Sequence, residues 1–317
     1  MLLARRRGMR EIAWASAGAA LSSAALTLLL GCGGGGVPSA PSSPGATGAI
    51  AFYLEHPDSA KAEIWTVEAD GSNLTQLTGG VFDLMPAWSR SHSRLAFVRD
   101  SGNGTPREIY VMNADGSGLR RLTTAPGGSP SYPAWSPDES RVAYTRWDTD
   151  NLEHVFIINA DGTGDHRLTT ATFAEQFPAW TPDGRKLVYT GDADPTPDTF
   201  DLFMAPADGK SPPVQLTHAA GANAWADWSP DGTQLVFVSD RSGSRDIYVM
   251  NNAGTVRKLT AFNAVDVRKP IWSGDGTRIV FALFVGNGDY EIETMSPDGS
   301  DVKDLTNRLG EDLDPTW

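Results

Sequence analysis

The sequence predicts an all-β protein, a six-bladed β-propeller whose blades each contain four strands. The motif Pro-Ala-Trp, or a close variant, occurs six times at intervals of 44 to 48 residues. A fixed period of this size, filled with short strands and Gly/Pro turns, is typical of one propeller blade. No segment beyond the N-terminal leader shows a convincing helical period. The six motifs end at Trp88, Trp135, Trp180, Trp228, Trp272 and Trp317.

The first half of the repeat consists of two strands joined by a tight turn. Residues 178–189 read Pro-Ala-Trp-Thr-Pro-Asp-Gly-Arg-Lys-Leu-Val-Tyr. Pro suits an early turn position, Asp bonds its own backbone, and Gly accepts positive φ. The turn recurs after Trp135, Trp228 and Trp272, but residues 88–92 read Trp-Ser-Arg-Ser-His and lack both Pro and Gly.

The second half is a hairpin. Residues 109–123 read Ile-Tyr-Val-Met-Asn-Ala-Asp-Gly-Ser-Gly-Leu-Arg-Arg-Leu-Thr, in which a β-branched and aromatic strand meets Asp-Gly, a strong hairpin signal. An acidic residue lies at the start of this strand in five copies, and His154 takes its place in the sixth. Because it recurs, we expect a structural role such as a hydrogen bond between blades. The five acids are Glu63, Glu108, Asp201, Asp246 and Glu291.

The phase of the repeat predicts how the ring closes. The first copy begins at residue 49 with the second strand, and the chain ends on a Trp strand at residues 314–317. Pairing the C-terminal strand with the N-terminal blade removes two open sheet edges and completes six blades.

The repeat resembles that of TolB-type propellers in its Trp-Ser-Pro-Asp-Gly turn and its Ile-Tyr-Val-Met-Asn strand, over about residues 49–317. The resemblance implies a protein partner in the cell envelope, such as a peptidoglycan-associated lipoprotein. TolB also carries an α/β domain before its propeller, and we expect no counterpart here.

The N-terminus predicts a lipid anchor. Four arginines precede an apolar run over residues 12–30, which favours a signal peptide over a permanent transmembrane helix. The following Leu-Leu-Gly-Cys resembles the lipobox of bacterial lipoproteins, and Cys32 is the only cysteine. We therefore divide the chain into a signal peptide (1–31), a lipidated Cys32 with a flexible Gly/Pro/Ser-rich linker (32–48) and the propeller (49–317). Gly33 favours the outer membrane over the inner one.

Charge and motif content exclude several functions. The formal net charge of −13 disfavours nucleic acid and anionic lipid as partners. Catalytic signatures are lacking, and the five histidines fall at different positions of different copies, so we expect no metal and no cofactor. Calcium is an alternative at two acidic loops, although neither has EF-hand spacing. These loops contain Asp148 and Asp150, and Asp192, Asp194, Asp198 and Asp201.

Candidate binding residues are those that vary inside the fixed frame of the repeat. In TolB-like propellers the entry to the innermost strand faces the central opening, so we expect these residues to line it, unless the rings among them pack into the core. Three residues before each Trp lie Met85, Tyr132, Phe177, Trp225, Lys269 and Asp314. Five residues before it lie Asp83, Pro130, Glu175, Asn223, Val267 and Asp312.

Aromatic groups with a Lys/Asp pair opposite suit a peptide or a small amphipathic ligand. We therefore predict a non-enzymatic, membrane-anchored propeller that binds an envelope protein or other envelope component at its central opening. The alternatives are a sugar lyase or hydrolase with its site in the opening, and a carbohydrate-binding surface protein. The recurrent tryptophans are predicted to be core between the blades.

Overall fold

A computed structural model describes residues 48–56, 61–79, 82–102, 106–124, 128–192, 199–218, 221–262, 266–286, 288–307 and 310–317. The described residues all lie in one compact unit, Gly45–Trp317. They form 24 strands, and no helix occurs among them. The predicted signal peptide, Cys32 and nearly all of the predicted linker lie outside the described residues.

The strands form six antiparallel blades, numbered here from the N-terminus and written from the innermost strand outward. Blade 1 contains β24 (Glu311–Thr316), β1 (Ile50–Glu55), β2 (Ala62–Val67) and β3 (Thr75–Gln76). Blade 2 contains β4 (Phe82–Trp88), β5 (Arg94–Asp100), β6 (Glu108–Asn113) and β7 (Arg120–Arg121). Blade 3 contains β8 (Pro130–Trp135), β9 (Arg141–Trp147), β10 (Glu153–Asn159) and β11 (His166–Arg167).

The second half of the chain repeats the pattern. Blade 4 contains β12 (Glu175–Trp180), β13 (Lys186–Gly191), β14 (Asp201–Pro206) and β15 (Val214–Gln215). Blade 5 contains β16 (Asn223–Trp228), β17 (Gln234–Ser239), β18 (Asp246–Asn251) and β19 (Val256–Lys258). Blade 6 contains β20 (Val267–Trp272), β21 (Ile279–Gly286), β22 (Asp289–Met295) and β23 (Lys303–Asp304).

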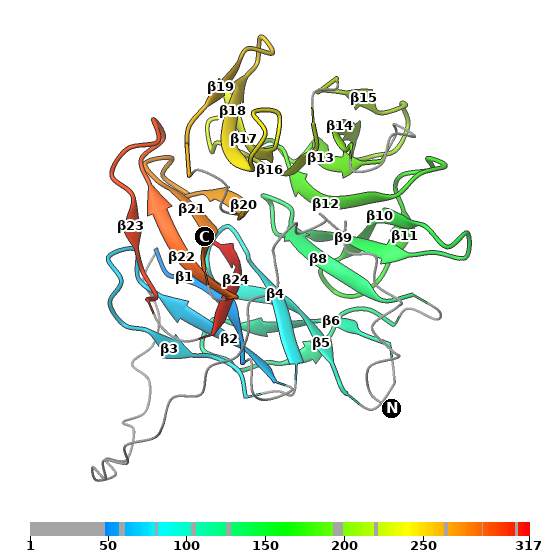
Figure 1. Ribbon diagram of the computed structural model, residues 1–317. Helices are drawn as coiled ribbons and strands as arrows, with labels where there is room; N and C mark the ends of the chain where they lie inside the picture. Colours follow the sequence, from blue (N-terminus) through cyan, green and yellow to red (C-terminus); the bar gives the residue numbers. More distant parts are fainter. Residues whose placement is uncertain are drawn as a thin grey trace, which may run out of the picture. The chain divides into compact units, whose positions relative to one another are not determined.

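The blades surround a central axis, and each innermost strand contacts the innermost strand of the next blade (Figure 1). The ring closes as the sequence predicts, because β24 pairs antiparallel with β1, with Tyr53 opposite Leu313 and Leu54 opposite Asp312. The six-bladed all-β propeller is therefore confirmed. One isolated parallel bridge, between Ala62 and Phe82, also joins blades 1 and 2.

The core lies between successive blades. The second strand of every blade carries one aromatic ring that is at most 1% exposed, so each ring fills the space between two sheets. These rings belong to Phe52, Phe97, Tyr144, Tyr189, Phe237 and Phe281.

The recurrent polar residues of the third strands bond both between blades and within them. As expected, Asn223 of blade 5 donates to Asp201 of blade 4 at 3.3 Å, and His154 of blade 3 bonds to Glu175 of blade 4.

Bonds to the Leu-Thr strand of the same blade, which the sequence did not suggest, are added to these. The Thr123 hydroxyl donates to Glu108 at 2.6 Å, and the Thr217 hydroxyl donates to Asp201 at 2.6 Å. The same threonine oxygen accepts the amide of the next residue of the third strand, for example Ile109 N at 2.9 Å. Four of the five acids fasten the short outer strand of their own blade in this way: Glu108, Asp201, Asp246 and Glu291. Glu63 bonds instead to His56 at 2.8 Å.

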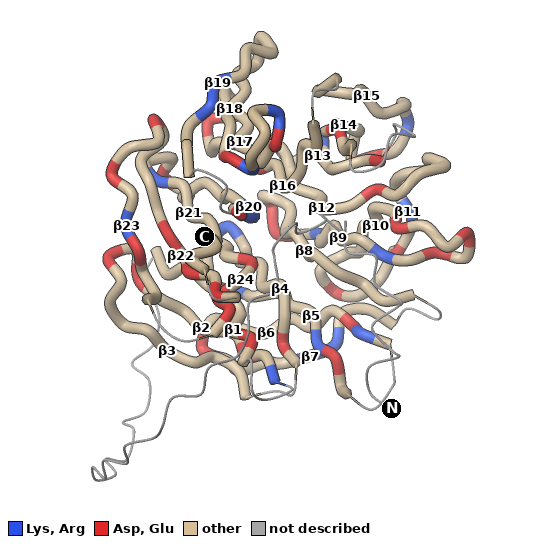
Figure 2. The backbone as a smooth tube through the Cα atoms, in the orientation of Figure 1, with Lys and Arg blue, Asp and Glu red and all other residues tan. Residues whose placement is uncertain are grey.

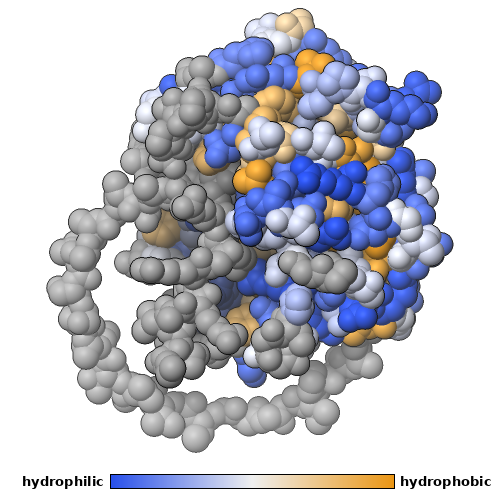
Figure 3. All heavy atoms as spheres, turned by 90° about the vertical axis from the view of Figure 1, so that its right-hand side faces the viewer, coloured by the Kyte–Doolittle hydropathy of each residue, from blue (hydrophilic) through white to orange (hydrophobic). Residues whose placement is uncertain are grey.

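Charged residues lie mainly at the ends of strands and in the loops of the described ranges (Figure 2). The face shown in Figure 3 is largely hydrophilic, with apolar residues scattered among polar ones. Large exposed apolar side chains include Leu119 and Val214 near the outer hairpins. Singly scattered residues of this kind are normal for a protein surface, so the candidate site is sought in the ring itself.

Candidate functional site

The innermost strands share a β-bulge at one position. In each of them the register breaks around the residue three places before Trp. That residue adopts a left-handed backbone with φ between 48° and 56° in all six blades, although none is glycine. Such a conformation costs about 1–2 kcal/mol per residue and bulges redirect side chains, so the ring holds these six positions in a special geometry. They are Met85, Tyr132, Phe177, Trp225, Lys269 and Asp314.

Three of these side chains form an aromatic arc, defined here as Tyr132, Phe177 and Trp225 on blades 3, 4 and 5. The Tyr132 and Phe177 ring centroids lie 4.4 Å apart in a T-shaped pair, and those of Phe177 and Trp225 lie 5.3 Å apart. Phe177 is buried, whereas Tyr132 and Trp225 are half-buried. Met85 on blade 2 is 4% exposed. The bulge thus brings side chains from successive blades into contact with one another.

The last two bulge residues, Lys269 and Asp314, form a charged group with Asp227 of blade 5. Lys269 Nζ lies 3.4 Å from the backbone oxygen of Asp314 and interacts electrostatically with the carboxylates of Asp314 and Asp227. Burial lowers the pKa of Lys269 and raises that of Asp314. Burial also raises the pKa of Asp227 to about 7, although Asp227 accepts the Trp272 amide at 2.9 Å. Part of Lys269 and Asp227 remains accessible because both line a cavity.

Asp227 is a site residue that sequence reasoning missed. It directly precedes Trp228, at a position where the other blades carry a neutral residue. This one charged residue in an otherwise neutral position was the sequence signal that could have identified Asp227 as a site residue. The neutral residues are Ala87, Ala134, Ala179, Ile271 and Thr316.

The candidates five residues before Trp are buried and bonded within the ring. Asp83 forms a bidentate pair with Arg99, at 2.6 and 2.8 Å. A hydrogen bond of 2.9 Å joins the Glu175 carboxyl group to His154 Nδ1 and links blade 4 to blade 3. Asn223 Oδ1 accepts from Arg241 at 2.6 Å, and Asp312 is fully buried. Pro130 and Val267 are buried as well.

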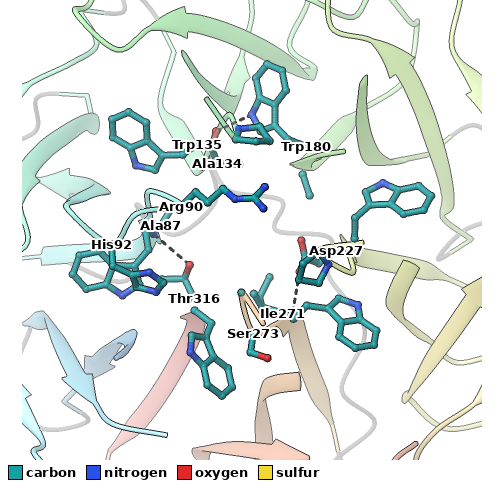
Figure 4. Close-up of a pocket in the computed structure, with 18 of the residues that line it drawn as sticks. Ala87, Arg90, His92, Ala134, Trp135, Trp180, Asp227, Ile271, Ser273 and Thr316 are labelled. Atoms are coloured by element: carbon teal, nitrogen blue, oxygen red, sulfur yellow. Dashed lines mark hydrogen bonds between the residues drawn. The ribbon is translucent and has the colours of Figure 1, made fainter. Parts of the chain in front are cut away.

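A cavity of about 780 Å³ lies at the end of the innermost strands where the tryptophans are found. Its walls combine indole rings with prolines of the Pro-Ala-Trp motif and of the turn that follows it (Figure 4). Lys269 and Asp227 also line it, so it reaches as far as the bulge residues. The tryptophans are therefore both interblade core, as predicted, and cavity wall: Trp88, Trp135, Trp180 and Trp272 are only 6% to 8% exposed.

Arg90 and His92 also line this cavity and were not selected from the sequence as site residues. Figure 4 shows the Arg90 side chain extending from blade 2 toward the middle of the cavity, with Trp135 and Trp180 beyond it and Asp227 on another side. His92 packs against Trp88, with ring centroids 5.6 Å apart. The signal for both was the irregular turn at residues 88–92.

The proposed metal ligands have other partners. Asp148 and Asp150 lie 3.2 and 3.1 Å from Arg167. Asp201 bonds to Thr217, whereas Asp194 and Asp198 lie outside the described residues. The part of the chain that the structure describes contains no group of three or more His, Cys, Asp or Glu side chains arranged to hold a metal. It also contains no helix long and apolar enough to cross a membrane.

Comparisons with known proteins identify the fold family. The family model for the TolB beta propeller domain matches residues 55–211 and 198–317. No curated protein sequence matches the chain. TolB from Acinetobacter baumannii has a similar structure, with a TM-score of 0.74 and 22% identity over 85% of this chain. The match covers 66% of that TolB chain, which is just under two thirds of its length.

Other solved propellers are also similar in fold. The putative TolB from Agrobacterium tumefaciens has a TM-score of 0.67 and 20% identity, covering 84% of this chain and 92% of its own. A chain of the nidogen/laminin complex has a TM-score of 0.65 and 14% identity, with coverage of 85% and 98%. Because the model of the TolB beta propeller domain matches most of the sequence, this chain belongs to that family.

Proposed function

We propose that this protein is a non-enzymatic, lipid-anchored component of the bacterial cell envelope whose propeller binds another envelope protein at the central opening. The observation that carries the proposal is the cavity of about 780 Å³ in the ring, whose walls are aromatic and whose inner end is charged. Concave sites that combine apolar walls with a few placed polar groups are typical of ligand binding. Membership of the TolB beta propeller domain family supports a protein partner.

The anchor belongs to the same proposal. Cys32 would be lipidated, including palmitate among its acyl chains, and residues 33–48 would tether the propeller close to the membrane surface. Several acyl chains on one residue give stable anchoring. Gly33 favours the outer membrane, and a peptidoglycan-associated lipoprotein is the partner that the family suggests.

Capture from chemically cross-linked envelopes tests the proposal. The full-length protein should capture a specific partner, and a variant carrying Tyr132→Leu, Phe177→Leu and Trp225→Leu should capture much less. Leucine keeps much of the buried apolar volume while removing the aromatic contacts of the arc. Phe203→Ala is the control. Phe203 is a 7% exposed core ring of blade 4 that belongs to neither the arc nor the cavity lining, so its loss should destabilise the protein by about 3–5 kcal/mol yet leave both in place. Equal capture by the triple variant and the wild type would exclude the arc from the interface.

A sugar lyase is the second candidate, because an oligogalacturonate lyase in complex with manganese shares the fold, with a TM-score of 0.57 and 15% identity. Incubation with oligogalacturonate and Mn²⁺, followed by ultraviolet absorbance of unsaturated products, distinguishes the two candidates. Product formation would replace the binding role with an enzymatic one.

A further inference from the structure

The turn of blade 2 places a cation where the other blades carry neutral residues. Two residues after the tryptophan, blades 3, 4 and 5 have Pro137, Pro182 and Pro230, and blade 6 has Gly274. Blade 2 has Arg90 at this position. All five residues line the central cavity, so the substitution changes the chemistry of the cavity without changing its frame.

The turn that carries Arg90 has the same backbone hydrogen bond as the regular turns of the other blades. The His92 amide donates to Ser89 O at 2.8 Å, as the Gly232 amide donates to Ser229 O at 2.8 Å in blade 5. His92 takes the glycine position with a φ of 54°. The next blade holds the turn as well, because Ser91 N donates to Glu139 Oε1 at 2.7 Å. A turn that lacks the usual Pro, Asp and Gly is thus kept in the same shape by a contact from blade 3.

The Arg90 guanidinium has no ion pair or hydrogen bond within the described part of the chain. The other cavity cations differ, since Arg278 donates to Asp301 at 2.6 Å and Lys269 interacts with Asp314 and Asp227. His92 Nε2 also lacks a hydrogen-bond partner among the described residues. Arg90 is an exposed residue, and its guanidinium extends into the cavity (Figure 4), so it is accessible and free to bind an anion that enters there.

We propose that the cavity binds the carboxylate of a peptide, with Arg90 as its anchor. Guanidinium groups hold carboxylates through two parallel N–H···O bonds, which fix orientation as well as charge. The tryptophan and proline walls would pack against the apolar residues that flank the carboxylate. Asp227 on the cavity wall disfavours a more highly charged anion such as phosphate. This inference rests on the proposed function and names the chemical group that the opening recognises.

The test uses the full-length protein in detergent micelles and measures binding by calorimetry. The probes are an acetylated apolar tetrapeptide with a free C-terminal carboxylate, its C-terminal amide, and the amide with one internal Glu. Inorganic phosphate is the fourth probe. The variants are Arg90→Pro, which installs the residue of blades 3 to 5, and Arg90→Gln. The control is Arg185→Gln, an exposed turn residue of blade 4 that does not line the cavity.

We expect the free carboxylate to bind about ten- to a hundredfold more tightly than the neutral amide, the factor expected of an ionic hydrogen bond. Both Arg90 variants should lose that advantage, Arg185→Gln should keep it, and Arg90→Pro should melt no lower than the wild type. Recovery of binding by the internal Glu would identify a side-chain carboxylate as the ligand group. Without that recovery the C-terminal carboxylate is the group.

Equal binding of acid and amide, or unchanged binding by Arg90→Pro, would overturn the inference. Phosphate binding as tight as peptide binding would overturn the assignment to a carboxylate. The proposed function fails separately: if no envelope partner is captured while the peptide still binds through Arg90, only the envelope role is wrong. If a partner is captured equally by Arg90→Pro and no peptide binds, only the carboxylate site is wrong.

Discussion

Replacing Asp227 by Asn should make the protein more stable at neutral and alkaline pH and remove one pH dependence of its stability. The wild-type carboxyl lies beside Lys269 in the cavity wall and accepts the Trp272 amide at 2.9 Å. Asn keeps an oxygen that can accept this amide but carries no charge. The variant therefore isolates the cost of holding a carboxylate at this position.

The magnitude follows from the pKa. Burial raises the pKa of Asp227 from its ordinary value of 3.8 to about 7 in the folded protein. Between these values the folded carboxyl keeps its proton while the unfolded one has lost it, so the wild type loses stability as the pH rises from about 4 to 7. Each pKa unit corresponds to about 1.4 kcal/mol, and we expect the difference between variant and wild type to change by roughly 2–4 kcal/mol across this window.

Urea unfolding of both proteins between pH 4 and pH 8 measures this difference. Asp231→Asn, in the neighbouring turn, is a control whose pH dependence has the opposite sign and falls below about pH 4, so its difference from the wild type should stay constant from pH 4 to pH 8. Bonds from the Ser229 hydroxyl and the Thr233 amide lower the pKa of Asp231, so its contribution is present above the unfolded pKa and is lost as the pH falls. A difference between Asp227→Asn and wild type that stays constant from pH 4 to pH 8, or that turns against the variant as the pH rises, would refute the reasoning.

Three further predictions concern the frame and the anchor. Deleting residues 312–317 removes the buried Leu313 and the pairing of β24 with β1, and should lower Tm by roughly 10 °C. Moving this strand in front of residue 49 through a Ser-Pro-Asp-Gly turn should restore Tm. An unchanged Tm in the deletion variant would contradict the ring closure. Glu139→Ala removes the hydrogen bonds to Ser91 N and the Arg94 guanidinium and should lower the free energy of unfolding in urea by about 1–2 kcal/mol. An unchanged free energy of unfolding would show that the blade 2 turn keeps its shape without Glu139. Cys32→Ser should abolish lipidation, so metabolic labelling with palmitate and membrane fractionation should both become negative; a processed, labelled, membrane-bound variant would exclude the lipobox.

The sequence by itself determined the architecture because propeller signals are local and repeated. The Trp period sets the blade length, and the turn residues that follow Trp180 and Trp228 carry their own backbone preferences. The phase of the repeat also predicted that β24 would complete blade 1, since the surplus strand at one end matches the gap at the other. Each of these inferences needs only neighbouring residues and the need to cover sheet edges.

Only the tertiary structure decided what the varying positions do. The residues three before Trp share a left-handed bulge, a backbone state that Met, Tyr or Lys does not signal in sequence. The residues five before Trp are occupied by partners such as Arg99 and Arg241, whose arrival depends on the register of the second strand. Arg90 and Asp227 become significant because the ring brings blades 2 and 5 around one cavity. Charge and burial at a site depend on everything that surrounds it, and those surroundings come from blades far apart in the chain.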